Sequence, residues 1–287
     1  IKITKLCRLF GFSKQAYYKR INTSDTIDYQ EVKALVMNVR SQLPKSGARK
    51  IYHMISEDLR KKNIKMGRDK LFSYLRSEHL LVPNRKKYHK TTNSKHWMRK
   101  YPNIIKDLEI NRPEQVWVAD ITYLQVKKKH YYLHLITDAY SKRIVGFKLS
   151  ENMQATTTLK ALKMALSERV YKEQLIHHSD RGLQYCSSIY TKTLADSNIK
   201  VSMTEEYDPY ENAVAERING ILKSEFGIDE VFENYELLEL QVLQSIALYN
   251  QLRPHMSIGL LTPNNAHKQR TVKLKTWKQK TYTKLMI

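Results

Sequence analysis

Hydrophobic residues recur at helical spacing through the first third of the chain. Over residues 51–59 they stand at i, i+3, i+4 and i+8, a pattern that predicts an amphipathic helix. A second amphipathic run carries Leu71, Leu75 and Leu81. With no strand-like alternation between these runs, we expect residues 28–82 to be wholly helical.

A shorter helical pattern precedes this region. Leu6 and Leu9 share one face of a first helix, Gly11 breaks that helix, and Ser13 is placed to cap a second one. Two short helices joined by a turn can place one helix in the major groove of DNA. A small helical bundle with no DNA role has the same pattern, so both interpretations of residues 1–24 stay open.

The pattern changes to the alternation of β-strands from Val116 onward. It predicts three strands, VWVADITYLQV, HYYLHLITDAY and RIVGFKLS, with a turn at the run KKKH after the first strand. Connections this short imply an antiparallel three-strand meander. Helical spacing then returns over residues 156–170, where Leu159, Leu162, Ala165 and Leu166 form the predicted buried face.

Shorter elements follow the meander and its helix. LIHHSD reads as a buried strand, residues 188–197 as a helix, and IKVSM as another short strand. Three strands, helix, strand, helix, strand, helix is the order of the ribonuclease-H-like α/β fold, although α/β folds reuse such pieces. Within this core we expect the aromatic side chains Trp117, Tyr131 and Tyr132 to serve packing.

Charge divides the chain more sharply than hydropathy does. The net charge of +22 is concentrated in residues 1–112, which hold 27 Lys/Arg against 9 Asp/Glu, whereas residues 113–270 hold 18 against 19. The tail, residues 271–287, adds five lysines and no acid. A basic arm beside a balanced core indicates a nucleic-acid partner, because clustered cations repel one another without a polyanion. A basic protein kept soluble by lysine is the plainer alternative.

These observations divide the chain into five expected parts. They are a helix-turn-helix-like segment (1–24), a helical DNA-binding domain (25–83), a basic linker (84–112), a ribonuclease-H-like catalytic core (113–270) and a basic tail (271–287). No apolar run is long enough for a membrane-spanning helix. The two cysteines stand far apart, which argues against disulfides and zinc fingers and for a reducing compartment.

Three carboxylates stand out in the core. Asp120 interrupts an apolar strand, Asp180 follows a buried strand, and Glu216 lies on a predicted helix that Asp208, Pro209 and Glu211 would start as a capping box. Burying an ionised carboxylate without a partner costs on the order of several kcal/mol. An aspartate inside an apolar strand therefore indicates a function or a bound partner that offsets this cost. Hard divalent cations prefer oxygen ligands, and three carboxylates on separate elements can hold two of them.

The surrounding motifs resemble a known family. WVADITYL, HHSDRGLQYCS and YDPYENAVAERINGILKSE are similar to the catalytic blocks of bacterial DDE transposases of the insertion-sequence-3 family. The 35 residues between Asp180 and Glu216 and the basic Lys223, seven positions after the glutamate, match that family's spacing. LYNQLRPHMSIGLLTPNNAH is similar to its closing segment, and the resemblance extends from about residue 3 to residue 268.

The resemblance implies an enzyme that binds the terminal inverted repeats of its own element, cleaves 3′ ends and transfers the strands to target DNA. It implies Asp120, Asp180 and Glu216 as catalytic metal ligands for two Mg²⁺ ions, with Mn²⁺ as a substitute. The expected DNA-binding residues are Lys223, Arg181, Gln184, Tyr185 and Asn212, and His178 is expected to support Asp180. Since two DNA ends must be handled together, we expect a homodimer or larger assembly on double-stranded DNA.

Several alternatives remain open. A ribonuclease H or junction resolvase would use the same carboxylates without a joining step, and a repressor or architectural protein would bind DNA with an inactive core. His178, Gln184, Tyr185 and Asn212 are equally compatible with structural roles. Lys223 could be only a helical partner of Glu216.

Overall fold

The structure is a computed structural model that describes residues 3–22, 27–83, 97–205 and 212–274 of the chain. The chain divides into two compact units. A helical unit comprises residues 1–41 and 47–81, and a larger α/β unit comprises residues 42–46 and 82–287. Each is described by itself.

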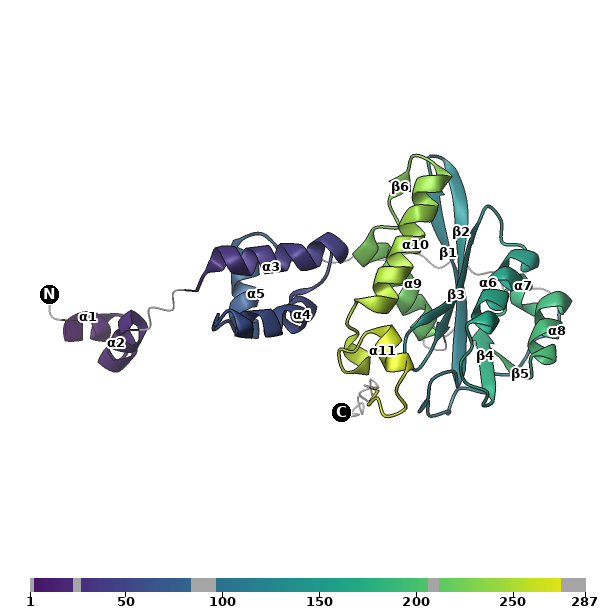
Figure 1. The fold of residues 1–287 in the computed structure, drawn as a ribbon, viewed down its shortest axis with the longest axis horizontal. Coiled ribbons are helices and arrows are strands. Elements are labelled where there is room, and N and C mark those ends of the chain that lie inside the picture. Colours follow the sequence, from purple (N-terminus) through teal and green to yellow (C-terminus); the bar gives the residue numbers. More distant parts are fainter. Residues whose placement is uncertain (1–2, 23–26, 84–96, 206–211, 275–287) are drawn as a thin grey trace, which may run out of the picture. The chain divides into compact units, whose positions relative to one another are not determined.

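The chain begins with two short helices, α1 (Ile3–Leu9) and α2 (Lys14–Asn22) (Figure 1). Gly11 has φ +71°, a left-handed conformation that favours glycine and ends the first helix. The Ser13 hydroxyl accepts a 3.0 Å hydrogen bond from the amide of Ala16, so it caps the second helix. The helix–turn–helix shape predicted for this segment is confirmed, as are its glycine break and serine cap.

Three further helices pack around one apolar core. They are α3 (Tyr29–Gln42), α4 (Ala48–Lys61) and α5 (Arg68–Ser77). The i, i+4, i+8 positions predicted on the second of them are buried, and this core contains Val32, Val36, Ile51, Ile55, Leu59, Met66, Leu71 and Leu75.

The last helix of this unit is shorter than the sequence pattern predicted. It ends at Ser77, whereas the apolar spacing suggested continuation to residue 82. His79 has φ +55°, which an α-helix does not accommodate, and the amide of Leu80 bonds back to the carbonyl of Leu75. Leu81 therefore packs on the core from a loop.

The α/β unit is built on one mixed sheet. The strands are β1 (Val116–Val126), β2 (Lys129–Asp138), β3 (Ile144–Ser150), β4 (Leu175–Ser179), β5 (Ile199–Met203) and the two-residue β6 (Val231–Phe232). Their order is β3-β2-β1-β4-β5, with β6 also pairing with β1. The first three strands form the predicted antiparallel meander, and β4 and β5 add in parallel. Val126 pairs with Lys129, so the first turn is shorter than the predicted run KKKH.

Helices cover both faces of this sheet, as Figure 1 shows. One face carries α6 (Ala155–Ser167), α7 (Leu183–Cys186) and α8 (Ser188–Asp196), whereas α9 (Ala213–Phe226) and α10 (Tyr235–Gln251) lie on the other. A 3₁₀ turn, η1 (Met256–Ile258), and α11 (Pro263–His267) complete the unit. This element order and layering is the ribonuclease-H-like arrangement predicted from the sequence.

The alternation along β1 decides which side chains face which helices. Trp117 and Ala119 pack into the core under α6, while Val116 and Val118 pack with Ala215 of α9. Asp120 continues the second series, so its carboxylate faces α9. Trp117 and Tyr131 are buried and Tyr132 is partly buried, in line with the packing role expected for them.

Helix α6 lies unusually close to the sheet because of one glycine. A Cβ atom at Gly146 would stand 2.3 Å from the carbonyl oxygen of Ala161, so no other residue fits there without moving the backbone. The helix ends at Ser167, three residues before the predicted end at Val170. The amide of Val170 donates instead to the buried Glu114 carboxylate, at 3.0 Å.

Residues preceding β1 are fixed to the same unit. The amide of Ile104 donates to the Ser202 hydroxyl at 3.1 Å, and that of Asn103 donates to the Glu205 carboxylate at 2.8 Å. Ile105 and Ile110 pack with the core between β1 and α9. Among the described helices, none combines the length and the apolar character needed to cross a membrane.

Candidate active site

Asp120 stands at the fifth position of the central strand, facing α9. Its Oδ1 accepts a 2.9 Å hydrogen bond from the amide of Ile121. Its Oδ2 accepts a 2.7 Å hydrogen bond from the side-chain amide of Asn219, on α9. Both carboxylate oxygens are thus held in place, one by the strand itself and one by the helix.

Asp180 follows β4 directly, and the sheet register brings it toward Asp120. The parallel pairing of β1 with β4 aligns Val118 with His178, so two residues further along each strand Asp120 is level with Asp180. The amide of Gly182 donates to Asp180 Oδ1 at 3.0 Å. A Cβ atom at Gly182 would lie 3.0 Å from that oxygen and 2.6 Å from Gln184 Nε2, so any larger residue there would press on both side chains.

Glu216 lies in the first turn of α9 and is exposed. The start of this helix is tied to the central strand, because the Asn212 side-chain amide donates to the carbonyl of Ala119 at 3.1 Å. Asn219 follows Glu216 by three residues and therefore shares its face of the helix. The predicted capping residues Asp208, Pro209 and Glu211 lie outside the described residues, and the described helix begins at Ala213.

The three carboxylates act on one another electrostatically. Burial and the charge of Asp180 raise the pKa of Asp120 from 3.8 to about 7, against the opposing hydrogen bonds from Asn219 and Ile121. Glu216 adds a smaller increase to the pKa of Asp120. Three elements far apart in sequence therefore bring negative charge to one place, as a cation site requires.

The donor set fits a hard divalent cation. Carboxylate oxygens are the ligands Mg²⁺ takes in proteins, and a cation would relieve the repulsion that raises the pKa of Asp120. Asn219 Oδ1 is buried and has no hydrogen-bond partner within the described part of the chain. In the same residues, no three His, Cys, Asp or Glu side chains already surround a metal position. The site is a group of neighbouring carboxylates rather than a closed cage.

The other predicted site residues divide into exposed and buried ones. Lys223 lies in the last turn of α9 and is partly buried, and Arg181 and Gln184 are partly exposed beside Asp180. Tyr185 is only 2% exposed, and burial followed by the charges of Asp180 and Asp120 raises its pKa. Its burial and that of Asn212 favour support of the site over the DNA contact predicted for them.

His178 is also fully buried. Its Nδ1 lies 2.8 Å from the hydroxyl of Ser202 on β5, which also accepts the amide of Ile104. These two bonds connect β4, β5 and the segment around Ile104 at a point two residues before Asp180. The geometry therefore favours a structural role for His178, in which it helps to position Asp180 from within the protein.

Two residues of the site were missed in the sequence. Asn219 and Gly182 each bond directly to a predicted catalytic carboxylate. Helical spacing three residues after Glu216 was a usable signal for Asn219. The closeness of Gly182 to Asp180, only two residues away, was a weaker signal, because glycine after a strand is usual in turns.

Two family models match the part of the chain that holds the three carboxylates. An integrase core domain family matches residues 110–209, which contain Asp120 and Asp180, and a second integrase core domain family matches residues 197–263, which contain Glu216. The HTLV-2 integrase catalytic core domain is similar in backbone at 22% identity and a TM-score of 0.44, over 54% of this chain and 97% of that chain.

Similarity to bacterial proteins extends over most of the chain. The uncharacterized 31 kDa protein of insertion element IS600 from Shigella sonnei is 31% identical over 260 residues, which cover 90% of this chain and 96% of that protein. The transposase InsF of insertion sequence IS3A from Escherichia coli (strain K12) is 30% identical over 211 residues, 73% of each chain. The chain therefore belongs to the bacterial insertion-sequence-3 family of transposases, polynucleotidyl transferases with an integrase core domain that act on DNA.

Proposed function

We propose that this chain is a DNA transposase that binds the terminal inverted repeats of its own element, cleaves their 3′ ends and joins those ends to a new phosphodiester. The observation that supports the proposal is the alignment of Asp120 with Asp180 by the parallel pairing of β1 with β4, together with the bond that joins Asp120 to Asn219, three residues after Glu216 on α9. A single site of this kind suits both steps. Each is an in-line attack of an oxygen on phosphorus, first by water and then by the freed 3′-hydroxyl.

The carboxylates would act as ligands for two divalent cations, Mg²⁺ with Mn²⁺ as a substitute. Asp120 and Asp180 would hold and share the ions, and Glu216 would complete the second position. When bound, such ions lower the pKa of the attacking hydroxyl and stabilise the leaving oxygen. Asn219 and Gly182 would keep the two aspartates in the orientation described above.

Polar residues around the carboxylates would bind the DNA or hold the site in shape. Lys223 lies two helical turns after Glu216, about 10 Å along the helix axis, and would contact a phosphate as a point charge. Arg181 and Gln184, beside Asp180, would contact the strand being cut. Asn212, Tyr185 and His178 would hold the elements of the site in position from within the protein.

We also propose a homodimer or larger assembly on duplex DNA, since both ends of an element must be handled together. Target DNA would be the second substrate. The bacterial cytoplasm is the compartment in which this substrate is found, and the two free cysteines, Cys7 and Cys186, suit its reducing conditions. Light scattering of the complex should give at least two subunits per pair of ends, and one subunit would contradict the assembly.

A strand-transfer assay tests the reaction. The full chain is incubated with Mg²⁺ and a labelled duplex of the element's end carrying a recessed 3′ terminus, and joined products are resolved by size. We expect joining by the wild type and none by Asp120→Asn or Glu216→Gln, both of which should still bind the duplex. Cleavage without joining would indicate a nuclease instead. Binding that ignores Mg²⁺, with Glu216→Gln retaining all activity, would indicate a DNA-binding protein without catalysis.

A further inference from the structure

Helix α5 presents a polar ridge to solvent. Leu71 and Leu75 are its buried positions. At 100° per residue the opposite side of the helix carries Ser73, Arg76 and Ser77, and all three are exposed. Serine hydroxyls and an arginine on an exposed helix face are groups that hydrogen-bond to base edges in the major groove of DNA.

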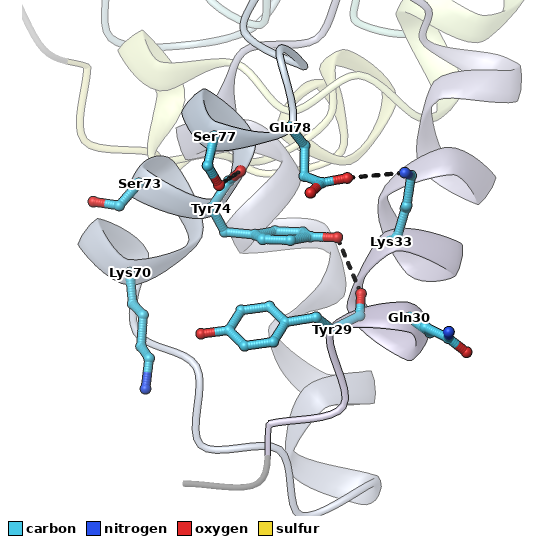
Figure 2. Close-up of a pocket in the computed structure, with 8 residues that line it drawn as sticks. All are labelled: Tyr29, Gln30, Lys33, Lys70, Ser73, Tyr74, Ser77 and Glu78. Atoms are coloured by element: carbon cyan, nitrogen blue, oxygen red, sulfur yellow. Dashed lines mark hydrogen bonds and ion pairs between the residues drawn. The ribbon is translucent and has the colours of Figure 1, made fainter.

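One flank of this ridge is a groove between α5 and the start of α3, shown in Figure 2. Its volume is about 590 Å³. The Tyr29 and Tyr74 rings form its base, with centroids 4.9 Å apart, and the Tyr74 hydroxyl donates to the carbonyl of Tyr29 at 3.1 Å. Lys70 and Ser73 line the α5 side of the groove. A lysine, a serine and a tyrosine are side chains that commonly contact phosphate oxygens.

A second groove, of about 580 Å³, lies at the start of α5. It is lined by the end of α4 and by the turn before α5, and it includes Tyr52, Ser56, Arg60, Asn63 and Lys65. Its last lining residue is Gly67, which directly precedes Arg68, so this groove adjoins the first turn of α5. Arg68 and Lys70 are 200° apart around the helix, so the ridge lies between the residue next to the second groove and the lysine that lines the first.

The Arg76 side chain of the ridge is held in place by a contact with an aromatic ring. The guanidinium of Arg76 lies 5.0 Å from the centre of the Phe72 ring, and Phe72 itself is 40% exposed. An arginine stacked in this way loses little side-chain freedom when it binds. The exposed ring beside it offers an apolar surface of the kind that contacts a thymine methyl group.

We propose that α5 is the helix that reads DNA sequence in the major groove, and that the two grooves beside it hold the two phosphodiester strands. The ridge-and-groove arrangement, with twelve Lys/Arg against six Asp/Glu in residues 28–83, suits duplex DNA. The deep, narrow major groove of A-form RNA would not admit it. The proposal rests on the proposed function, since it names the element by which the end of the mobile DNA is recognised.

The first two helices are a weaker candidate for this reading role. Leu9 of α1, Phe10 directly after it and Ile21 of α2 are exposed, so this pair leaves several of its large apolar side chains outside a core. In contrast, α5 is anchored by the closed core of the helical unit. A reading helix must hold its side chains within a narrow range of positions, which favours the anchored helix.

Binding selection with the full chain tests the reading role. A pool of duplexes with a randomised central segment is bound, recovered and sequenced for the wild type, Ser73→Ala and Arg76→Gln. We expect the wild type to select a motif, and each variant to lose preference at one or two adjacent positions of it. Arg76→Gln should bind the selected duplex at least about fivefold more weakly. An unchanged motif in both variants, or no motif with the wild type, would overturn the proposal.

Salt dependence tests the two grooves. Lys65→Ala and Lys70→Ala should each reduce the slope of log K against log salt by about one on any duplex, without altering the motif. Lys61→Ala removes the same charge from α4 beside Glu57, 3.1 Å away, and is the matched control with little expected change. If Lys65→Ala and Lys70→Ala reduced the slope no more than Lys61→Ala does, the grooves would be excluded as phosphate sites. Circular dichroism confirms that each variant is folded.

The two proposals fail separately. A wild type that joins DNA ends while the α5 variants keep its motif and affinity would leave the transposase function standing and remove the reading helix. A wild type that selects a motif through α5 but joins no ends would support the reading helix and contradict the transposase function.

Discussion

The side-chain amide of Asn219 donates a 2.7 Å hydrogen bond to Oδ2 of Asp120, and so connects the middle of α9 to the central strand. Glu216 lies one turn before Asn219 on the same helix. The hydrogen bond between Asn219 and Asp120 therefore helps to fix how far Glu216 lies from Asp120. Asn219 would act as a positioning residue for the proposed metal ligands.

Replacing Asn219 by alanine should lower strand transfer by 10- to 100-fold, about the range seen when outer partners of metal ligands are removed. The Mg²⁺ concentration for half-maximal activity should rise, because Asp120 loses the bond that orients it. Asn265→Ala, on an exposed position of α11, is the matched control. Unchanged Mg²⁺ dependence in Asn219→Ala would show that the hydrogen bond does not orient a ligand.

Gly182→Ala should also impair catalysis without unfolding the protein. The added Cβ would stand 3.0 Å from Asp180 Oδ1 and 2.6 Å from Gln184 Nε2, so both side chains must move. The Asp180 carboxylate would move by a few tenths of an ångström, so the rate should fall by less than the roughly 100-fold that a displacement of about 1 Å can cost. Gly47→Ala, where a Cβ also meets nothing within 4 Å, is the control. Wild-type rates for Gly182→Ala would mean that Asp180 tolerates the shift.

The sequence allowed the sheet and its carboxylates to be predicted because their signals are local. Alternation marked β1 to β3, and an aspartate within or directly after an apolar strand marked Asp120 and Asp180. Helix ends were less predictable. The end of α6 depends on the Glu114 carboxylate, 56 residues from the amide that it accepts, and no local pattern encodes such a partner.

Contacts between distant segments account for most of what was missed. Asn219 bonds to a residue 99 positions away, and Arg253 to one 28 positions away. The two-residue β6 carries too little pattern to be recognised alone. The grooves beside α5 depend on how α3, α4 and α5 pack, so exposed residues there look like ordinary surface in the sequence.

The ion pair between Arg253 and Glu225 should contribute strongly to stability. The Arg253 guanidinium is 3% exposed and donates two 2.8 Å hydrogen bonds to the Glu225 carboxylate at the end of α9. Arg253→Ala removes both bonds from the mostly buried Glu225 carboxylate and should lower the free energy of unfolding by about 3 kcal/mol. Denaturant unfolding measures this.

Two comparisons make the measurement of Arg253 specific. Arg253→Lys should recover only part of the loss, because lysine cannot form both bonds. Lys129→Ala breaks the exposed pair with Glu151, also 2.8 Å long, and should lower the stability far less, because solvent screens this pair. A loss for Arg253→Ala no greater than that of Lys129→Ala would contradict a stabilising role of the buried pair.

His267 links α11 to the sheet through a buried polar network. Its Nε2 lies 3.3 Å from Glu114 Oε1 and its Nδ1 lies 3.0 Å from the Ser141 hydroxyl. That hydroxyl donates to Asp138 Oδ1 at 2.6 Å. Burial acts to lower the pKa of His267, but its interactions with the carboxylates of Asp138, 3.7 Å from Nδ1, and Glu114 outweigh burial, and the pKa is raised above 6.5.

A raised pKa means that the folded protein holds this proton more tightly than the unfolded chain does. The stabilisation by His267 should be fully present below pH 6.5 and lost as the pH rises through the raised value. His134 and His177 act in the opposite direction, because burial lowers their pKa values to about 4 and about 3. These two histidines are present in both the wild type and His267→Gln, so their effect cancels when the unfolding free energy of one is subtracted from that of the other at each pH. We expect the difference to shrink as the pH rises above 6.5, and a constant difference would show that the pKa of His267 is the same in the folded and unfolded protein.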